Sequence, residues 1–190
     1  MELNAEQKIA ATREQVFAAL NDPEILMQCI PGCESLEKES DTEMTATVVL
    51  KVGPVKAKFK GRVELSNLVP PESYSISGEG AGGAAGYAKG GADIKLLDDG
   101  DGTTLQYQVN ADVGGRLAQL GGRLIESTAK TLSAKFFAKF CELVESATAV
   151  DATIPTEPVA ADTARDSNSK TWIWVALGGA VVILIYALLS

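Results

Sequence analysis

Few residues of this chain are suited to acid–base or nucleophilic chemistry, and their spacing forms no recognisable catalytic pair. The sequence contains no histidine, which removes imidazole catalysis, histidine-ligated metal and the usual proton shuttle. The remaining candidate acids and bases are three tyrosines and two carboxylates: Tyr74, Tyr87, Tyr107, Glu79 and Asp93. Because no nucleophile is paired with a base among them, the sequence predicts a protein that is not an enzyme.

The cysteines Cys29, Cys33 and Cys141 are odd in number, which favours small buried thiols over a disulfide framework. A metal site at Cys29 and Cys33 would need further soft ligands nearby, and the sequence offers none. We therefore expect neither a metal site nor a covalently bound cofactor.

Residues 78–92 contain twelve glycines or alanines in fifteen positions. Gly78, Gly80 and Gly83 match a G-x-G-x-x-G pattern, but the residues that follow alternate as a strand and form no helix to hold a pyrophosphate. Two neighbouring strands lined with such small residues leave space beneath a covering helix, which predicts a ligand cavity. The alternative is that large side chains of the helix fill that space.

Hydrophobic periodicity predicts the elements that surround this segment. A strand over 2–10 precedes a short helix over 13–20 with Thr12 as its N-cap, and a second helix covers 23–29 with Pro23 in its first turn. From residue 43 onward the apolar positions alternate, first in a hairpin around Gly53-Pro54 and then in three further runs, at 74–78, 88–96 and 105–113. These runs predict an antiparallel meander.

The period returns to 3.6 over 116–145, where an apolar stripe indicates one long helix. A strand, two short helices, a meander and a long helix predict an α+β fold of the helix-grip type, in which a curved antiparallel sheet wraps around the C-terminal helix. We assign residues 1–146 to this domain. Residues 147–170 are polar and rich in Ala, Thr, Asp and Ser, which is typical of a disordered linker.

Residues 171–189 contain no charged residue, and a helix of this length would be roughly 28 Å long. Trp172, Trp174 and Tyr186 lie near the two ends of this segment, as is common in membrane spans. The segment predicts a single-pass C-terminal anchor. The first residues do not resemble a signal peptide, so we expect the domain on the cytoplasmic side of the cell membrane.

The chain carries a net charge of −8, of which the domain holds about −6, and this argues against a nucleic-acid partner. One run of alternating residues has the opposite sign, and we call it the basic stripe: Lys56, Lys58, Lys60 and Arg62. It predicts a positive row on the outer face of the sheet, able to meet an acidic partner or anionic lipid. An ordinary solvated strand face is the alternative.

Four segments are distinctive when taken together: Ile30-Pro31-Gly32-Cys33-Glu34, the hairpin over 52–59, Gly90-Gly91-Ala92 and the Phe-rich helix. They resemble the CoxG family of carbon monoxide dehydrogenase subunits, which belongs to the START-like, or polyketide-cyclase-like, superfamily. The resemblance covers about residues 1–146. It implies a non-catalytic accessory protein that brings a molybdenum-containing dehydrogenase to the membrane, and the superfamily implies a hydrophobic cavity for lipid-like molecules.

Combined with the anchor, the resemblance suggests that the cavity takes a membrane lipid or a respiratory quinone. A cyclase or aromatase-type enzyme, or a general lipid carrier, remains an alternative that would use the same cavity. The residues expected to line the cavity are Met27, Ile30, Phe59, Tyr87, Ala88, Gly90, Ala92, Tyr107, Leu124, Phe136 and Phe140.

Overall fold

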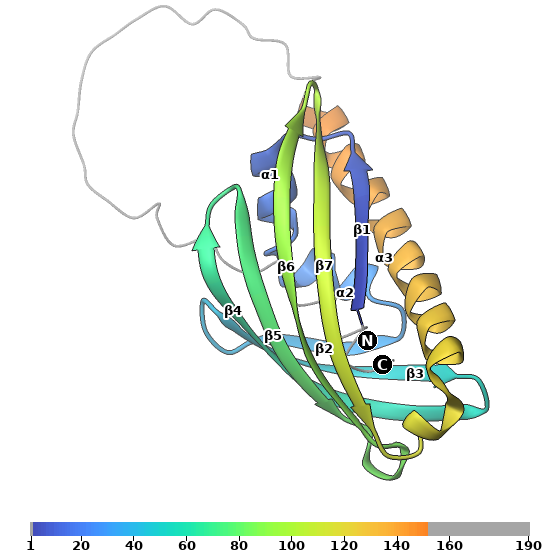
Figure 1. Cartoon of the computed structure of the whole chain (residues 1–190). Helices are drawn as coiled ribbons and strands as arrows, with labels where there is room; N and C mark the ends of the chain where they lie inside the picture. Colours follow the sequence, from blue (N-terminus) through green and yellow to red (C-terminus); the bar gives the residue numbers. More distant parts are fainter. Residues whose placement is uncertain (1, 152–190) are drawn as a thin grey trace, which may run out of the picture.

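The computed structural model describes residues 2–151, and Figure 1 shows their arrangement as one curved sheet with helices on its open side. The sheet is antiparallel, and its seven strands lie in the order β1-β7-β6-β5-β4-β3-β2. The strands are β1 (Glu2–Ile9), β2 (Cys33–Lys38), β3 (Glu43–Val52), β4 (Val55–Val69), β5 (Ser73–Ala81), β6 (Tyr87–Asp99) and β7 (Gly102–Gly114). The α-helices are α1 (Arg13–Ala19), α2 (Pro23–Cys29) and α3 (Gly122–Asp151).

Local signals in the sequence set the two short helices. Thr12 accepts from the amide of Gln15, whose side chain accepts from the amide of Thr12, and this capping box starts α1 as predicted. Asp22 caps α2 by accepting from two amides of the first turn, and Pro23 occupies the first helical position. Both predicted helices are confirmed.

The predicted hairpin is confirmed in register and in face. Val52 pairs with Val55 across the two-residue turn, and Met44 pairs with Val63 at the far end. The inward residues of both strands are buried except Val55 and Ala57 near the turn, which are half-buried, while Lys56 and Lys60 point to solvent. Strand β2 was not predicted, because its residues are mostly polar and show no clear alternation. Its pairing with β3 contains an irregularity after Cys33.

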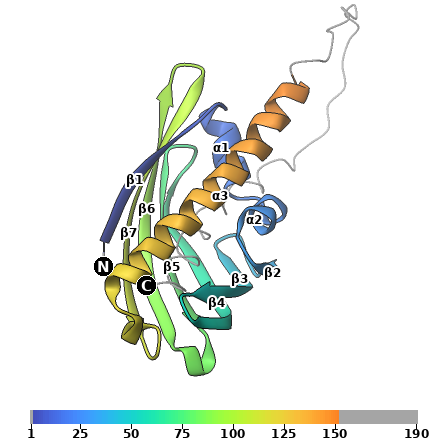
Figure 2. The same ribbon diagram turned by 90° about the vertical axis from the view of Figure 1, so that its right-hand side faces the viewer.

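The long helix begins later than its apolar stripe predicts. Residues 118–120 form a 3-10 turn, and α3 starts only at Gly122. Gly115 and Gly121 have positive φ values of 80° and 87°, which right-handed helix does not allow. The helix then runs to Asp151, five residues beyond the predicted domain boundary, and crosses the open side of the sheet (Figure 2).

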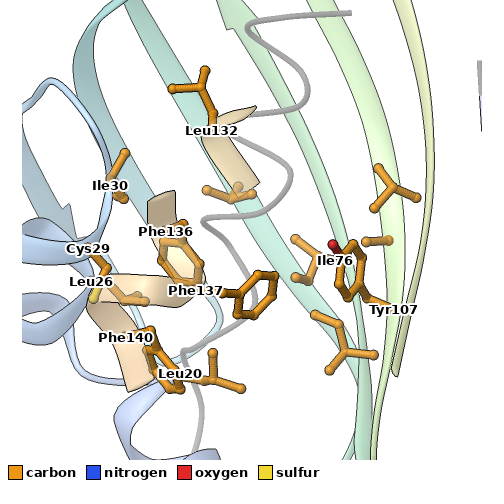
Figure 3. Packing of buried hydrophobic residues seen from close by; sticks show 14 of the residues in the cluster. Leu20, Leu26, Cys29, Ile30, Ile76, Tyr107, Leu132, Phe136, Phe137 and Phe140 are labelled. Atoms are coloured by element: carbon orange, nitrogen blue, oxygen red, sulfur yellow. The ribbon is translucent and has the colours of Figure 1, made fainter. Parts of the chain in front are cut away.

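Aromatic side chains fill the space between α3 and the sheet. Phe136 contacts Phe137 edge-on and stacks with Phe140, with ring centroids 5.2 and 5.8 Å apart. Phe17 of α1 meets Tyr74 of β5 edge to face at 5.7 Å. Figure 3 shows these helix residues between α2 and the strands, so that one core joins both short helices, α3 and the sheet.

No helix within residues 2–151 is long and apolar enough to cross a bilayer. The predicted anchor, 171–189, and residues 152–170 of the predicted linker lie outside the described residues.

Candidate ligand site between the sheet and the long helix

Small residues are gathered in two cross-strand rows on the concave face of the sheet, and we call these rows the small-residue patch. Strand pairing places Ala46 opposite Gly61, Gly61 opposite Gly80, and Gly80 opposite Ala88. The second row runs Gly78, Gly90 and Ala111, in three adjacent strands. Five strands therefore contribute to a strip that offers almost no side-chain volume to the interior.

Large side chains of α3 and of β4 pack beside this strip. Phe59 turns its ring against Gly82, where an added β-carbon would collide with the ring. Phe137 stacks on Tyr107 with centroids 5.4 Å apart, which ties the helix to β7 (Figure 3). Ala46 and Ala88 are almost fully buried. The interior of this structure is thus closed over the patch.

Two tyrosines place their hydroxyls on this apolar face. Tyr107 shares a hydrogen bond with Ser133 of α3, and burial raises its pKa even though that bond acts in the opposite direction. The Tyr74 hydroxyl is fully buried without a hydrogen-bond partner among the described residues, and burial raises its pKa well above the usual value. Tyr74 lies on the same face of β5 as Gly78, two inward positions away. The Tyr74 hydroxyl can therefore donate a hydrogen bond to a bound molecule or to a water.

Seven of the eleven residues expected to line a cavity are buried in the core that joins α2, α3 and the sheet. They are Ile30, Phe59, Ala88, Ala92, Tyr107, Phe136 and Phe140. Leu124 lies at the first turn of α3 against the β3–β4 turn and is 37% exposed. It therefore sits at the rim of the interior and not inside it.

Two residues of the predicted cavity point away from it. Tyr87 directly precedes Ala88 in β6, so the pleat turns it to the outer face, where its ring covers Gly114 of β7. Met27 is 46% exposed on α2, whose buried positions are Leu26 and Cys29. The assignment of Tyr87 and Met27 to the interior was wrong.

Gly90 belongs to the patch, but its role differs from the one expected. A β-carbon at Gly90 would collide with the carbonyl oxygen of Asn110 and lie 3.0 Å from the Cα of Ala111. The residue is glycine because β7 approaches its backbone closely, and not because a ligand needs the space. Ala92, which carries a β-carbon on the same face, is the better probe of the interior.

The two largest hollows on the described residues open on the outer face of the sheet, directly behind the patch. Gly78, Gly90 and Ala111 line one of about 690 Å³, and Ala46, Gly61, Gly80 and Ala88 line one of about 830 Å³. Charged side chains, among them Arg62, Glu79 and Lys89, surround both hollows. An apolar ligand is better suited to the uncharged concave face, which remains the candidate site.

Sequence reasoning missed most of the small-residue patch. Ala46, Gly61 and Gly80 were recognised only as strand residues or as part of a glycine-rich segment. They become one site because the register aligns them, and register is a property of strand pairing. Counting residues outward from the Gly53-Pro54 turn would have placed Ala46 opposite Gly61, so this part of the patch could have been predicted.

The structure gives the cysteines no reactive environment. Burial raises the pKa of Cys29 to about 12, so this thiol is neutral at physiological pH. Cys33 and Cys141 are also free thiols with pKa values raised by burial. Among residues 2–151, no group of three or more His, Cys, Asp or Glu side chains is placed to hold a metal ion.

The basic stripe lies on the outer face of the sheet as predicted, but half of its charge is paired. Lys58 forms an ion pair of 2.6 Å with Glu34, and Arg62 pairs with Glu43 of the neighbouring strand. Lys56 and Lys60 take part in no ion pair within the described part of the chain. The stripe therefore offers two free cations rather than four.

Comparisons with solved structures agree with this geometry. A conserved protein from Geobacillus kaustophilus is 32% identical with a TM-score of 0.73, over 77% of this chain and 97% of its own. The match therefore spans almost the whole length of that chain. An aromatase/cyclase from Streptomyces sp. R1128 shares the fold at 12% identity with a TM-score of 0.56, over 78% of this chain and 95% of its own.

No curated protein matches the chain. The model of one protein family, the CoxG subunit of carbon monoxide dehydrogenase, matches residues 6–144, which include the small-residue patch and almost all of its cover. The chain belongs to the CoxG family and has the helix-grip fold of the START-like superfamily.

Proposed function

We propose that this protein is a non-catalytic accessory of a molybdenum-containing, carbon monoxide dehydrogenase-type hydroxylase. In this proposal it holds a lipid-like ligand, a respiratory quinone, between the concave face and α3. Residues 171–189 anchor it in the cytoplasmic membrane, where it recruits the hydroxylase and couples it to electron transfer. The family name supports the link to carbon monoxide dehydrogenase.

The observation that carries the ligand proposal is the small-residue patch on the concave face of the sheet, the face that α3 crosses. Phe136, Phe137 and Leu132 can change rotamer or move with α3, and the patch then provides the volume that a flat ring needs. Uptake therefore involves displacement of α3 from the sheet. At Gly121 and Gly122 an added β-carbon would meet no atom within 4 Å, so the first turn of α3 has open space beside it.

The Tyr74 hydroxyl favours a quinone over a hydrocarbon. A quinone carries two carbonyl oxygens that accept hydrogen bonds, and a buried donor without a partner gains by meeting one. A pure hydrocarbon would leave that donor unsatisfied.

The partner would dock on the basic stripe, where Lys60 is a free cation at the centre of the outer face. Reversal by Lys60→Glu is expected to weaken co-sedimentation of the dehydrogenase with vesicles that carry the protein, most strongly at low salt. Lys58→Gln, which removes a cation already paired with Glu34, serves as the control. Equal recruitment by Lys60→Glu and wild type at low salt would contradict this docking site.

Mass spectrometry of an organic extract tests the ligand directly. Full-length protein purified from membranes in mild detergent is expected to release a quinone close to one per chain. Extraction of phospholipid alone, or of no ligand, would count against the quinone. The same preparation, incubated with a polyketide chain, tests the cyclase alternative through product formation.

A further inference from the structure

Three connections of the chain meet at one end of the molecule, at the start of α3 (Figures 1 and 2). The amide of Leu117 donates to the carbonyl of Ala85 at 3.0 Å, which joins the β7–α3 connection to the β5–β6 connection. A β-carbon at Gly53 would lie 2.9 Å from Leu124, so the β3–β4 turn reaches α3. We call this surface the glycine-rich end and define it as residues 49–57, 81–88 and 113–125.

The glycine-rich end is basic in an acidic chain. Its three segments contain Lys51, Lys56, Arg116 and Arg123 and no acidic residue, whereas the whole chain carries −8. All four side chains are exposed, and none forms an ion pair among residues 2–151. Lys51 stands directly opposite Lys56, and like charges in that position destabilise a hairpin. Asp112 and Glu126 border the third segment, and they pair with Lys89 and Lys130, although Glu126 also attracts Arg123. The two facing lysines form no ion pair among the described residues, and this cost indicates a use outside the fold.

Exposed apolar side chains lie among these cations. Leu124 follows Arg123 at the first turn of α3 and is 37% exposed, while Tyr87 at the start of β6 is 51% exposed. Pro54 at the tip of the β3–β4 turn is exposed as well. Basic side chains alone would be sufficient to bind an acidic groove of a protein partner. The combination of basic and apolar side chains is suited to anionic headgroups with hydrocarbon beneath them.

The opposite end of the domain has the opposite charge. The β6–β7 turn carries Asp98, Asp99 and Asp101, and the last turns of α3 carry Glu142 and Glu145. Lys8 and Arg13 are already paired with acids of that turn, Lys8 with Asp99 and Arg13 with Asp98. A negatively charged surface would therefore attract the glycine-rich end and repel the other.

We propose that the glycine-rich end docks on the surface of an anionic lipid bilayer. The described chain ends at Asp151, about 45 Å along α3 from this end, since thirty helical residues rise about 1.5 Å each. Residues 152–170 span at most about 65 Å when extended, so a domain anchored by 171–189 reaches the same bilayer. The docking surface requires neither the anchor nor a bound quinone.

Vesicle flotation of a chain ending at Asp151 tests this proposal without the anchor. We expect binding to vesicles of phosphatidylcholine and phosphatidylglycerol at 3:1, little binding to phosphatidylcholine alone, and release at 0.5 M salt. Each basic residue near an anionic surface is worth about fivefold in partitioning. Arg116→Gln with Arg123→Gln should therefore weaken binding about 25-fold.

Lys95→Gln with Lys135→Gln is the matched control, because these exposed lysines lie outside the glycine-rich end and form no ion pair in the described structure. It removes the same net charge, and binding is expected to change less than about twofold. Circular dichroism and thermal unfolding show that each variant is folded.

The proposal is overturned if wild type binds both vesicle types equally, or if the two double variants lose binding equally. In full-length protein reconstituted into the same two lipids, amides of 113–125 should exchange hydrogen more slowly in the anionic bilayer. Equal exchange in both would also overturn it. A missing quinone would contradict the proposed ligand and leave these results unaffected.

Discussion

The ring of Tyr107 in β7 stacks on the ring of Phe137 in α3, with centroids 5.4 Å apart and planes inclined by 29°. The hydroxyl of the same tyrosine shares a hydrogen bond with Ser133, one turn earlier in the helix. One side chain of the sheet therefore holds two successive turns of α3. This contact ties α3 to β7 two inward positions away from Ala111 of the small-residue patch, so a displacement of the helix that admits a ligand would strain or break it.

Tyr107→Phe keeps the stacked ring and removes the hydrogen bond. We expect it to lower the free energy of unfolding by about 1 kcal/mol, because Ser133 is buried and loses its partner. Tyr74→Phe removes a hydroxyl without a partner and should be neutral or stabilising. Urea denaturation of both variants measures the difference. Equal destabilisation by the two changes would contradict this expectation, because it would mean that the Tyr74 hydroxyl forms a stabilising hydrogen bond in the folded protein.

Alkaline pH should destabilise the folded domain. Burial raises the folded-state pKa values of Tyr74 and Tyr107, so below pH about 10 both states keep these phenolic protons. Above that pH the unfolded chain releases them first, and the free energy of unfolding falls by up to about 1.4 kcal/mol per pH unit for each group. Cys29, with a pKa of about 12, acts in the same direction from pH about 9 upward.

Denaturation between pH 8 and 11 measures this slope, and Tyr74→Phe should reduce it above pH 10. A slope that is the same in wild type and in this variant would mean that Tyr74 ionises equally easily in both states.

Ala92→Leu tests whether the concave face can open. If the interior expands to admit a ligand, the added side chain occupies ligand space, and quinone binding falls while stability changes by less than about 1 kcal/mol. Ala57→Leu, at a half-buried position near the start of β4, is the control. Destabilisation of about 1–3 kcal/mol without a separate binding defect would show that helix side chains fill the space permanently.

Alanine substitutions at two glycines distinguish a position where two backbones lie close together from one where glycine only adds flexibility. Gly90→Ala should destabilise the domain by several kcal/mol, because the β-carbon collides with the backbone of Asn110 in the paired strand. Gly122→Ala places its β-carbon in open space at the first position of α3 and should raise stability by about 0.5–1 kcal/mol. Thermal unfolding of the pair provides the measurement, and a tolerated Gly90→Ala would contradict the close strand packing.

Much of the local structure could be predicted from the sequence, because its causes lie within a few residues. The capping box at Thr12 and the cap at Asp22 place two helices, and the alternation on each side of Gly53-Pro54 gives both the hairpin and its buried face. The same alternation was sufficient to turn Tyr87 outward, since it adjoins the buried Ala88. The inward assignment of Tyr87 overlooked that rule.

The candidate site depended on tertiary structure. The sequence by itself determined which residues are small and where strands begin, but only the pairing of β3 through β7 aligned Ala46, Gly61, Gly80 and Ala88 in one row. Strand β2 likewise forms because β3 offers an edge to its polar residues. Glycine conformations at 115 and 121 delayed the start of α3 despite an unbroken apolar stripe. Register, edge pairing and backbone conformation arise from contacts between distant segments, which no local pattern specifies.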